Sequence, residues 1–123
     1  MSAESWLSEL FKFIDARDAR GFAQYLSENV EFRFGNSPPV DGRVAVMQVV
    51  DGFFRSISGL RHELIQVWRQ AGSVICHGNV TYVRLDGSSL CVPFANIFIL
   101  SGKLVSRYLI FVDISALYAA DGG

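Results

Sequence analysis

The chain has 123 residues and a mass of 13.6 kDa, enough for one hydrophobic core, so we expect residues 1–123 to form a single domain. Its 11 basic and 12 acidic residues give a net charge of -1 with no run of either sign, which disfavours nucleic acid as a partner. Polar residues interrupt every apolar run before the roughly 18 residues that span a bilayer, and the start lacks a signal peptide's basic and apolar regions. We therefore expect a cytoplasmic protein with no membrane partner.

Helical spacing dominates the first half of the chain. Residues 3–16 place apolar side chains at intervals of three and four, which predicts an amphipathic helix. Asp18 is suited to cap a short second helix that ends near Leu26. Residues 30–34 predict a short strand that is closed by a turn, and residues 43–57 predict another amphipathic helix.

The second half has the composition of strands. Residues 61–70 predict one strand, and residues 73–113 predict three more, joined by tight turns at Gly87-Ser88 and Ser101-Gly102. Residues 114–120 could add one turn of helix. This order predicts an α+β domain in which helices cover one side of a curved antiparallel sheet. Such a sheet encloses a cone with an apolar interior, a common site for a small ligand.

Strand alternation predicts which residues share one face of the sheet. A two-residue turn at Gly87-Ser88 pairs Asp86 with Ser89 and sets the register of the two strands around it. In that register one face carries His77, Asn79, Thr81 and Val83, opposite Phe98, Asn96, Phe94 and Val92 respectively. The family resemblance given below implies that this face lines the pocket.

For the last strand, counting from Asp113 turns Tyr108 and Ile110 toward the pocket. The opposite parity would present Arg107 and Leu109 instead.

The other face of the predicted sheet is too apolar for solvent, and we expect it to bury against a second copy in a homodimer. It comprises Val74, Cys76, Gly78, Val80, Tyr82 and Arg84 with Cys91, Pro93, Ala95, Ile97 and Ile99. In this register Cys76 and Cys91 are too far apart for a disulfide, so both should be free thiols.

Four segments carry a resemblance that covers almost the whole chain. They read FIDARDARGFAQYLSENVEFRF, PPVDGR, HELIQVW and DGSSLCVPFANIFILSGKLVSRYLIFVDISALYA. Together they resemble the SnoaL-like branch of the nuclear transport factor two-like superfamily. The resemblance implies a cone-shaped fold that hosts ketosteroid isomerases, limonene epoxide hydrolases, polyketide cyclases, dehydratases and non-catalytic binding modules.

The catalytic positions of these families carry other residues here. The base, tyrosine and acid of the ketosteroid isomerases fall on Phe32, Leu10 and Asn96, of which only Asn96 could donate a hydrogen bond to an oxyanion. The charged set of the limonene epoxide hydrolases falls on Asn79, Thr81 and Ile110, and its water-orienting residues fall on Phe32 and Phe34. The acid-base aspartate of the polyketide cyclases lies near Ile110 as well. The chain therefore lacks the carboxylates on which these families rely.

Several residues have both a functional and a structural interpretation. His77 could be a general base or a hydrogen-bonded core histidine, and Asn79 and Asn96 could orient a ligand or satisfy each other. Tyr108 could donate a hydrogen bond at the pocket or pack as a core aromatic.

Other residues have a mainly structural interpretation. Asp113 is expected to cap the terminal turn at Ser115, and the pair His62-Glu63 is expected to be solvated on an edge strand.

We therefore predict a protein that binds a small hydrophobic or aromatic molecule, with isomerase, cyclase or lyase chemistry, or alternatively a non-catalytic binding or dimeric interaction module. The candidate catalytic residues are His77, Asn96 and Tyr108. The candidate ligand-binding residues are Phe32, Phe34, Phe54, Asn79, Thr81, Val83, Val92, Phe94 and Ile110. The pattern of residues predicts neither a metal nor a cofactor.

Overall fold

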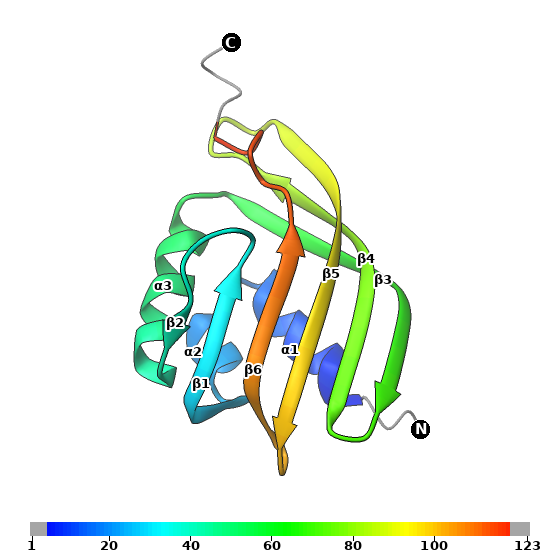
Figure 1. The fold of residues 1–123 in the computed structure, drawn as a ribbon. Helices are drawn as coiled ribbons and strands as arrows, with labels where there is room; N and C mark the ends of the chain where they lie inside the picture. The colour runs from blue at the N-terminus through cyan, green and yellow to red at the C-terminus, as the bar shows by residue number, and fades with distance from the viewer. Residues whose placement is uncertain (1–4, 119–123) are drawn as a thin grey trace.

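The computed structural model describes residues 5–118, which form one sheet and the helices that pack on it (Figure 1). The helices are α1 (Ser5–Asp15), α2 (Ala19–Ala23) and α3 (Arg43–Arg55). The strands are β1 (Leu26–Phe34), β2 (Val40–Asp41), β3 (Gly59–Gln70), β4 (Ser73–Val83), β5 (Ser89–Ser101) and β6 (Leu104–Val112). No helix in this part of the chain is long and apolar enough to cross a membrane.

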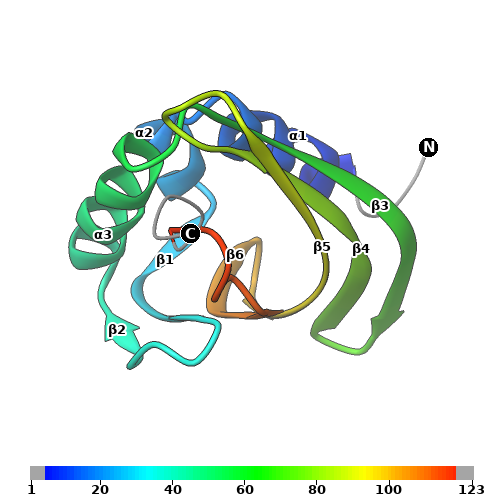
Figure 2. The same ribbon diagram turned by 90° about the horizontal axis from the view of Figure 1, so that it is seen from above.

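The strands form one curved sheet in the order β2-β1-β6-β5-β4-β3. Neighbouring strands are antiparallel except for β1 and β6, which run parallel, so the sheet is mixed where the sequence predicted an antiparallel one. Seen from above, the sheet curls around an interior that α1, α2 and α3 close (Figure 2). The predicted α+β cone is confirmed.

The helices pack through the stripes that their sequences predict. Leu7, Leu10, Phe11 and Ile14 of α1 are buried at intervals of three and four. The Asp18 side chain accepts a hydrogen bond from the Gly21 backbone nitrogen at 2.9 Å, so Asp18 caps α2 as expected. Helix α2 ends before Leu26 because β1 already begins there, with the buried Leu26 paired to Val105 of β6.

The curvature of the sheet depends on a β-bulge in β3. The register shifts between Leu64 and Gln66, opposite Gly78 of β4. A Cβ atom at Gly78 would collide with the Glu63 carbonyl oxygen, so only glycine fits between the two strands at this bend. The bulge bends the edge of the sheet back toward α1, which closes this side of the cone.

The β4–β5 turn is longer than the sequence predicted, and this changes the register. Val83, not Asp86, pairs with Ser89. The Arg84 nitrogen donates to the Ser88 oxygen at 2.7 Å, and Gly87 adopts a positive φ of 91°, which closes a three-residue loop. The predicted register is wrong by an odd number of residues, so every side chain of β4 points to the other face.

The correction exchanges the two faces of β4. His77, Asn79, Thr81 and Val83 lie on the convex face and not in the pocket. Their neighbours Val74, Cys76, Val80 and Tyr82, which were predicted for the outer face, are buried in the core. The predictions for β5 and β6 hold, because Phe94, Asn96, Phe98 and Tyr108 are buried on the concave face.

Both cysteines are free, as expected, with Cys76 buried and Cys91 exposed. After β6, Asp113 accepts a hydrogen bond from the Ser115 nitrogen at 2.9 Å, as the sequence predicted. Residues 114–118 form a turn closed by Leu117 and not the start of a helix. The remainder of the helix predicted over residues 114–120 lies outside the described residues.

Candidate functional site

An apolar cavity of about 60 Å³ lies between the concave face of the sheet and the helices. Val49 of α3, which is 48% exposed, belongs to its lining, so the cavity reaches the surface beside α3. The polar groups in the lining are those of His62, Tyr82, Asn96 and Tyr108. The apolar lining consists of Ile14, Phe22, Phe32, Phe34, Val49, Val50, Phe53, Phe54, Leu60, Val80, Phe94 and Ile110.

Most of the aromatic and late-strand candidates lie at this cavity. The structure brings together Phe32, Phe34, Phe54, Phe94, Asn96, Tyr108 and Ile110. Val92 points to the same side of the sheet but borders a separate groove near the end of β6. The cavity wall at Phe32 and Ile110 is apolar, at positions where the family resemblance implies catalytic aspartates.

The candidates of β4 are absent from the cavity. His77 lies on the convex face, where its ring stacks on Trp68 with centroids 5.5 Å apart and planes inclined by 16°. Asn79, Thr81 and Val83 follow on the same face, so Asn79 cannot pair with Asn96. The prediction of His77 as a base in the pocket is wrong because it relied on the two-residue turn.

The histidine at the cavity is His62 of β3, which sequence analysis assigned to solvent. Its side chain is only 11% exposed. Leu60, His62 and Leu64 alternate with exposed residues, so the inward face of β3 was readable from the period-two pattern. The partner of His62 was not readable, because it comes from the end of α1.

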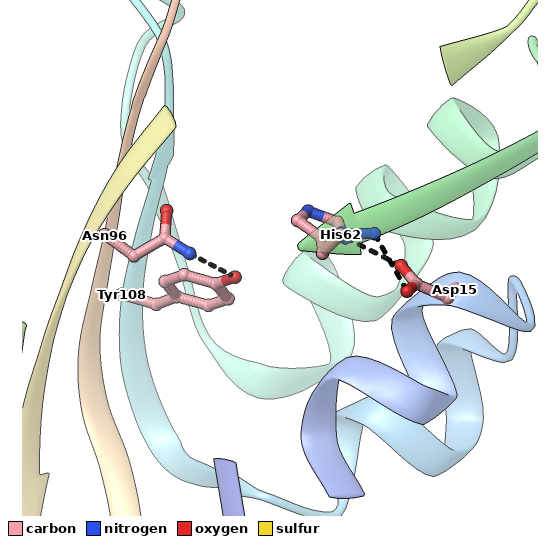
Figure 3. A network of polar contacts seen from close by, with 4 residues as sticks. All are labelled: Asp15, His62, Asn96 and Tyr108. Carbon is pink, nitrogen blue, oxygen red and sulfur yellow. Dashed lines mark hydrogen bonds and ion pairs between the residues drawn. The ribbon is translucent and has the colours of Figure 1, made fainter. Parts of the chain in front are cut away.

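That partner is Asp15, which holds the His62 imidazole from one side. Asp15 Oδ1 lies 2.6 Å from His62 Nδ1, and Asp15 Oδ2 accepts a hydrogen bond from the His62 backbone nitrogen at 3.0 Å. The ring also contacts Phe11 and Phe94, with centroid distances of 4.7 and 5.1 Å. These contacts leave Nε2 on the side of the ring that faces the cavity and the Asn96–Tyr108 pair (Figure 3).

The His62–Asp15 pair also reaches the outside of the molecule. His62 and Asp15 border a surface groove between α1 and β3, together with Lys12 and Leu64. The Asp15 side chain is 26% exposed there. The imidazole therefore lies between the apolar cavity and the surface groove.

Asn96 and Tyr108 form the opposite polar group of the cavity (Figure 3). Asn96 Nδ2 donates a long hydrogen bond of 3.4 Å to the Tyr108 hydroxyl. Burial raises the pKa of Tyr108 well above its ordinary value, so the hydroxyl stays protonated and can donate. Asn96 Oδ1 is buried and has no hydrogen-bond partner within residues 5–118.

Cys76 lies opposite Asn96 in the register but is unsuited to nucleophilic chemistry. Burial raises the pKa of its thiol to about 12, although hydrogen bonds with Asn96 act in the opposite direction. A thiol with this pKa is protonated near neutral pH, and the thiolate is the reactive form. The site therefore offers the imidazole of His62, the phenols of Tyr82 and Tyr108, and the amide of Asn96.

A family model describes the chain from residue 7 to residue 108, and its description is the SnoaL-like domain. The curated proteins contain no match.

Solved structures with the same fold cover nearly the whole chain. A protein from Jannaschia sp. CCS1, considered a SnoaL-like polyketide cyclase, is 17% identical, with a TM-score of 0.80 over 93% of this chain and 87% of that one. A Catenulispora acidiphila protein with a ketosteroid isomerase-like fold, solved with trimethylamine, is 10% identical, with a TM-score of 0.87 over 98% and 95% of the two chains. TerC, co-crystallised with polyporic acid, is 14% identical, with a TM-score of 0.80 over 95% of each chain.

At these identities the likeness concerns the fold alone, whereas the family model matches most of the sequence itself. The cone and its helices have the nuclear transport factor two-like fold. The chain belongs to the SnoaL-like domain family.

Proposed function

We propose that the protein binds a small hydrophobic molecule in the cavity and catalyses a proton transfer in that molecule, with His62 as the acid-base group. The observation that carries this proposal is the 2.6 Å contact between His62 Nδ1 and Asp15, at the wall of an apolar cavity. His62 replaces His77 in this role.

The contact with Asp15 gives His62 a defined tautomer. A carboxylate oxygen accepts, so Nδ1 carries the hydrogen and Nε2 keeps a lone pair toward the cavity. When Nε2 takes up a proton, the adjacent carboxylate stabilises the imidazolium, as an aspartate does in hydrolase triads. Asp15 is therefore a positioning residue, and His62 is the base.

The opposite side of the cavity supports the same reaction class. Removal of a proton from a carbon beside a carbonyl places negative charge on the oxygen, and a donor in a dry site stabilises that charge. Tyr108 is 2% exposed and keeps its hydroxyl proton, so it suits this position. Isomerase, cyclase and lyase reactions share this step, and cyclase-like relatives with the same fold support the assignment.

The proposal can be tested without the natural substrate. A small cyclic ketone such as cyclohexanone exchanges its α-hydrogens with D2O slowly, and NMR follows the loss of signal. We expect the protein to accelerate this exchange, and His62→Gln to reduce the acceleration by about 10²- to 10⁴-fold.

His77→Gln changes the histidine of the convex face and is the matched control, which should exchange like the wild type. A ketone that binds at the cavity but exchanges no faster than with free imidazole would exclude the acid-base role and indicate a binding module instead.

We further propose a homodimer formed through the convex face of the sheet. Four apolar residues lie side by side across four strands in the register, namely Trp68, Ile75, Ile97 and Leu109. Trp68 is 49% exposed, and Phe111 on the same face is 55% exposed. A continuous apolar stripe of this kind is typical of subunit contacts. The cytoplasm remains the proposed compartment, on the sequence argument given above.

A further inference from the structure

We infer that the ligand carries a hydroxyl group, and that Asn96 recognises it by accepting its hydrogen. The inference rests on the proposed function, since it concerns the same cavity, and it names the class of molecule. The ligand is a small neutral molecule with a phenolic, enolic or alcoholic oxygen at the end that meets Asn96 and Tyr108.

The first step is the unpaired oxygen of Asn96. Asn96 is 1% exposed, and its Oδ1 has no partner within the described part of the chain. Buried amide oxygens in native proteins nearly always accept a hydrogen bond, because an unpaired oxygen loses its hydrogen bonds with water and gains none in the protein. Asn96 lines the cavity, so a ligand there can supply the missing donor.

The second step is the orientation of the amide. Asn96 Nδ2 donates to the Tyr108 hydroxyl at 3.4 Å, which leaves Oδ1 as an acceptor and the Tyr108 hydrogen as a donor. One hydroxyl oxygen can use both groups, because it donates to Asn96 Oδ1 and accepts from Tyr108. A carbonyl or ether oxygen accepts only, so it would leave Oδ1 unpaired. The reversed amide would present donors only and would favour a carbonyl.

The third step is the charge of the lining. The cavity is bordered by phenylalanines and aliphatic residues, and its described lining contains no carboxylate, guanidinium or ammonium group. A charged ligand group placed deep in this lining would lose its hydration without a counter-ion. The His62 imidazole is already paired with Asp15. A neutral ligand therefore fits best.

The hydrogen-bonding groups of Asn96 and Tyr108 also favour one direction of the proposed proton transfer, from ketone to enol. A ketone in the cavity pairs with Tyr108 but not with Asn96 Oδ1. The corresponding enol is an isomer of the ketone with the proton on the oxygen instead of the carbon, and it pairs with both. The site would thus bind the enol more tightly than the ketone.

Two pairs of nearly isosteric probes test the hydroxyl preference, each titrated into 15N-labelled protein and followed at cavity residues by NMR. Phenol should bind about tenfold more tightly than toluene, and cyclohexanol more tightly than cyclohexanone. Transfer from water into an apolar cavity alone would give the opposite order for phenol and toluene, because phenol loses more hydration.

Asn96→Leu should abolish the preference, with the phenol-to-toluene affinity ratio falling about tenfold. Asn79→Leu is the matched control, since it makes the same change on the convex face of the neighbouring strand, and its ratio should equal the wild-type ratio. If Asn96→Leu does not fold, the order of the four probes' affinities for wild-type protein is sufficient to test the hydroxyl preference.

The inference is overturned if toluene binds wild-type protein as tightly as phenol, or if cyclohexanone binds more tightly than cyclohexanol. Either result leaves the proposed function intact when His62-dependent exchange of cyclohexanone is observed. If none of the four probes shifts a cavity resonance, both the inference and the proposed function fail.

Discussion

His62 and Asp15 are joined by two hydrogen bonds although 47 residues separate them in the chain. One bond, at 2.6 Å, involves the imidazole, and the other, at 3.0 Å, involves the backbone nitrogen of β3. The carboxylate therefore fixes both the ring and the strand that carries it. The edge strand of the sheet is thereby attached to the end of α1 at His62. Among the described residues, His62 is the only histidine in the cavity wall.

Replacing Asp15 by asparagine tests the positioning role. The amide oxygen of the new side chain could still accept from the His62 backbone nitrogen, so the fold should persist, but the ring would lose its anionic partner. We expect ketone exchange to fall about tenfold or more, and 15N NMR of the imidazole to show less of the tautomer with hydrogen on Nδ1. Asp51→Asn, which removes an exposed ion pair with Arg55 in α3, is the control. Unchanged tautomer signals in Asp15→Asn would refute the role.

The buried thiol predicts a loss of stability at alkaline pH. The pKa of Cys76 rises from 9.0 to about 12 on folding. Between these values the unfolded thiol is ionised and the folded thiol is protonated, so the unfolded state binds fewer protons and stability falls as pH rises. Tyr108 shifts in the same direction. Urea titrations from pH 8 to 11 should show this fall, with a shallower slope in Cys76→Val; equal slopes would contradict it.

Reaction with a thiol reagent gives an independent check on the same cysteine. At pH 8 the exposed Cys91 should react promptly, whereas Cys76 should react only after denaturation, because it is both buried and protonated. The expected stoichiometry is one thiol per native chain and two per unfolded chain. A native protein that loses both thiols at the same rate would show that the core around Asn96 opens readily.

Gly78→Ala should destabilise the fold far more than an ordinary glycine substitution. The added Cβ would collide with the Glu63 carbonyl oxygen beside the bulge of β3, so the two strands would have to separate. We expect a loss of about 3 kcal/mol or more in urea unfolding. Gly52→Ala, in α3 with no atom within 4 Å, is the control and should stabilise by about 0.5 to 1 kcal/mol. Similar effects of the two changes would contradict this account.

The sequence predicted the individual helices and strands better than it predicted the register and contacts between them. Periodicity located α1 and α3. Alternation within β5 and β6, with the pocket face taken from the family resemblance, placed Asn96 and Tyr108 on the correct face. The β4–β5 register required the length of a loop, and one misjudged turn moved His77 from the convex face into the predicted pocket. His62 shows a second limit of prediction from sequence, which concerns contacts between distant segments. Its inward direction was readable, but its contact with Asp15 depends on how α1 packs across β3.

The apolar stripe on the convex face supports a final prediction about assembly. Ile97 lies between Ile75 and Leu109 in the register, at the centre of this stripe, so a carboxylate there would be desolvated without a partner in a dimer. We expect wild-type protein to sediment as a dimer and Ile97→Glu to sediment as a monomer that keeps its fold, because its side chain points away from the core. Val44→Glu makes a similar change at an exposed position of α3 and should remain dimeric. Wild-type protein that sediments as a monomer at micromolar concentration would exclude this interface, and a dimeric Ile97→Glu would move the contact to another surface.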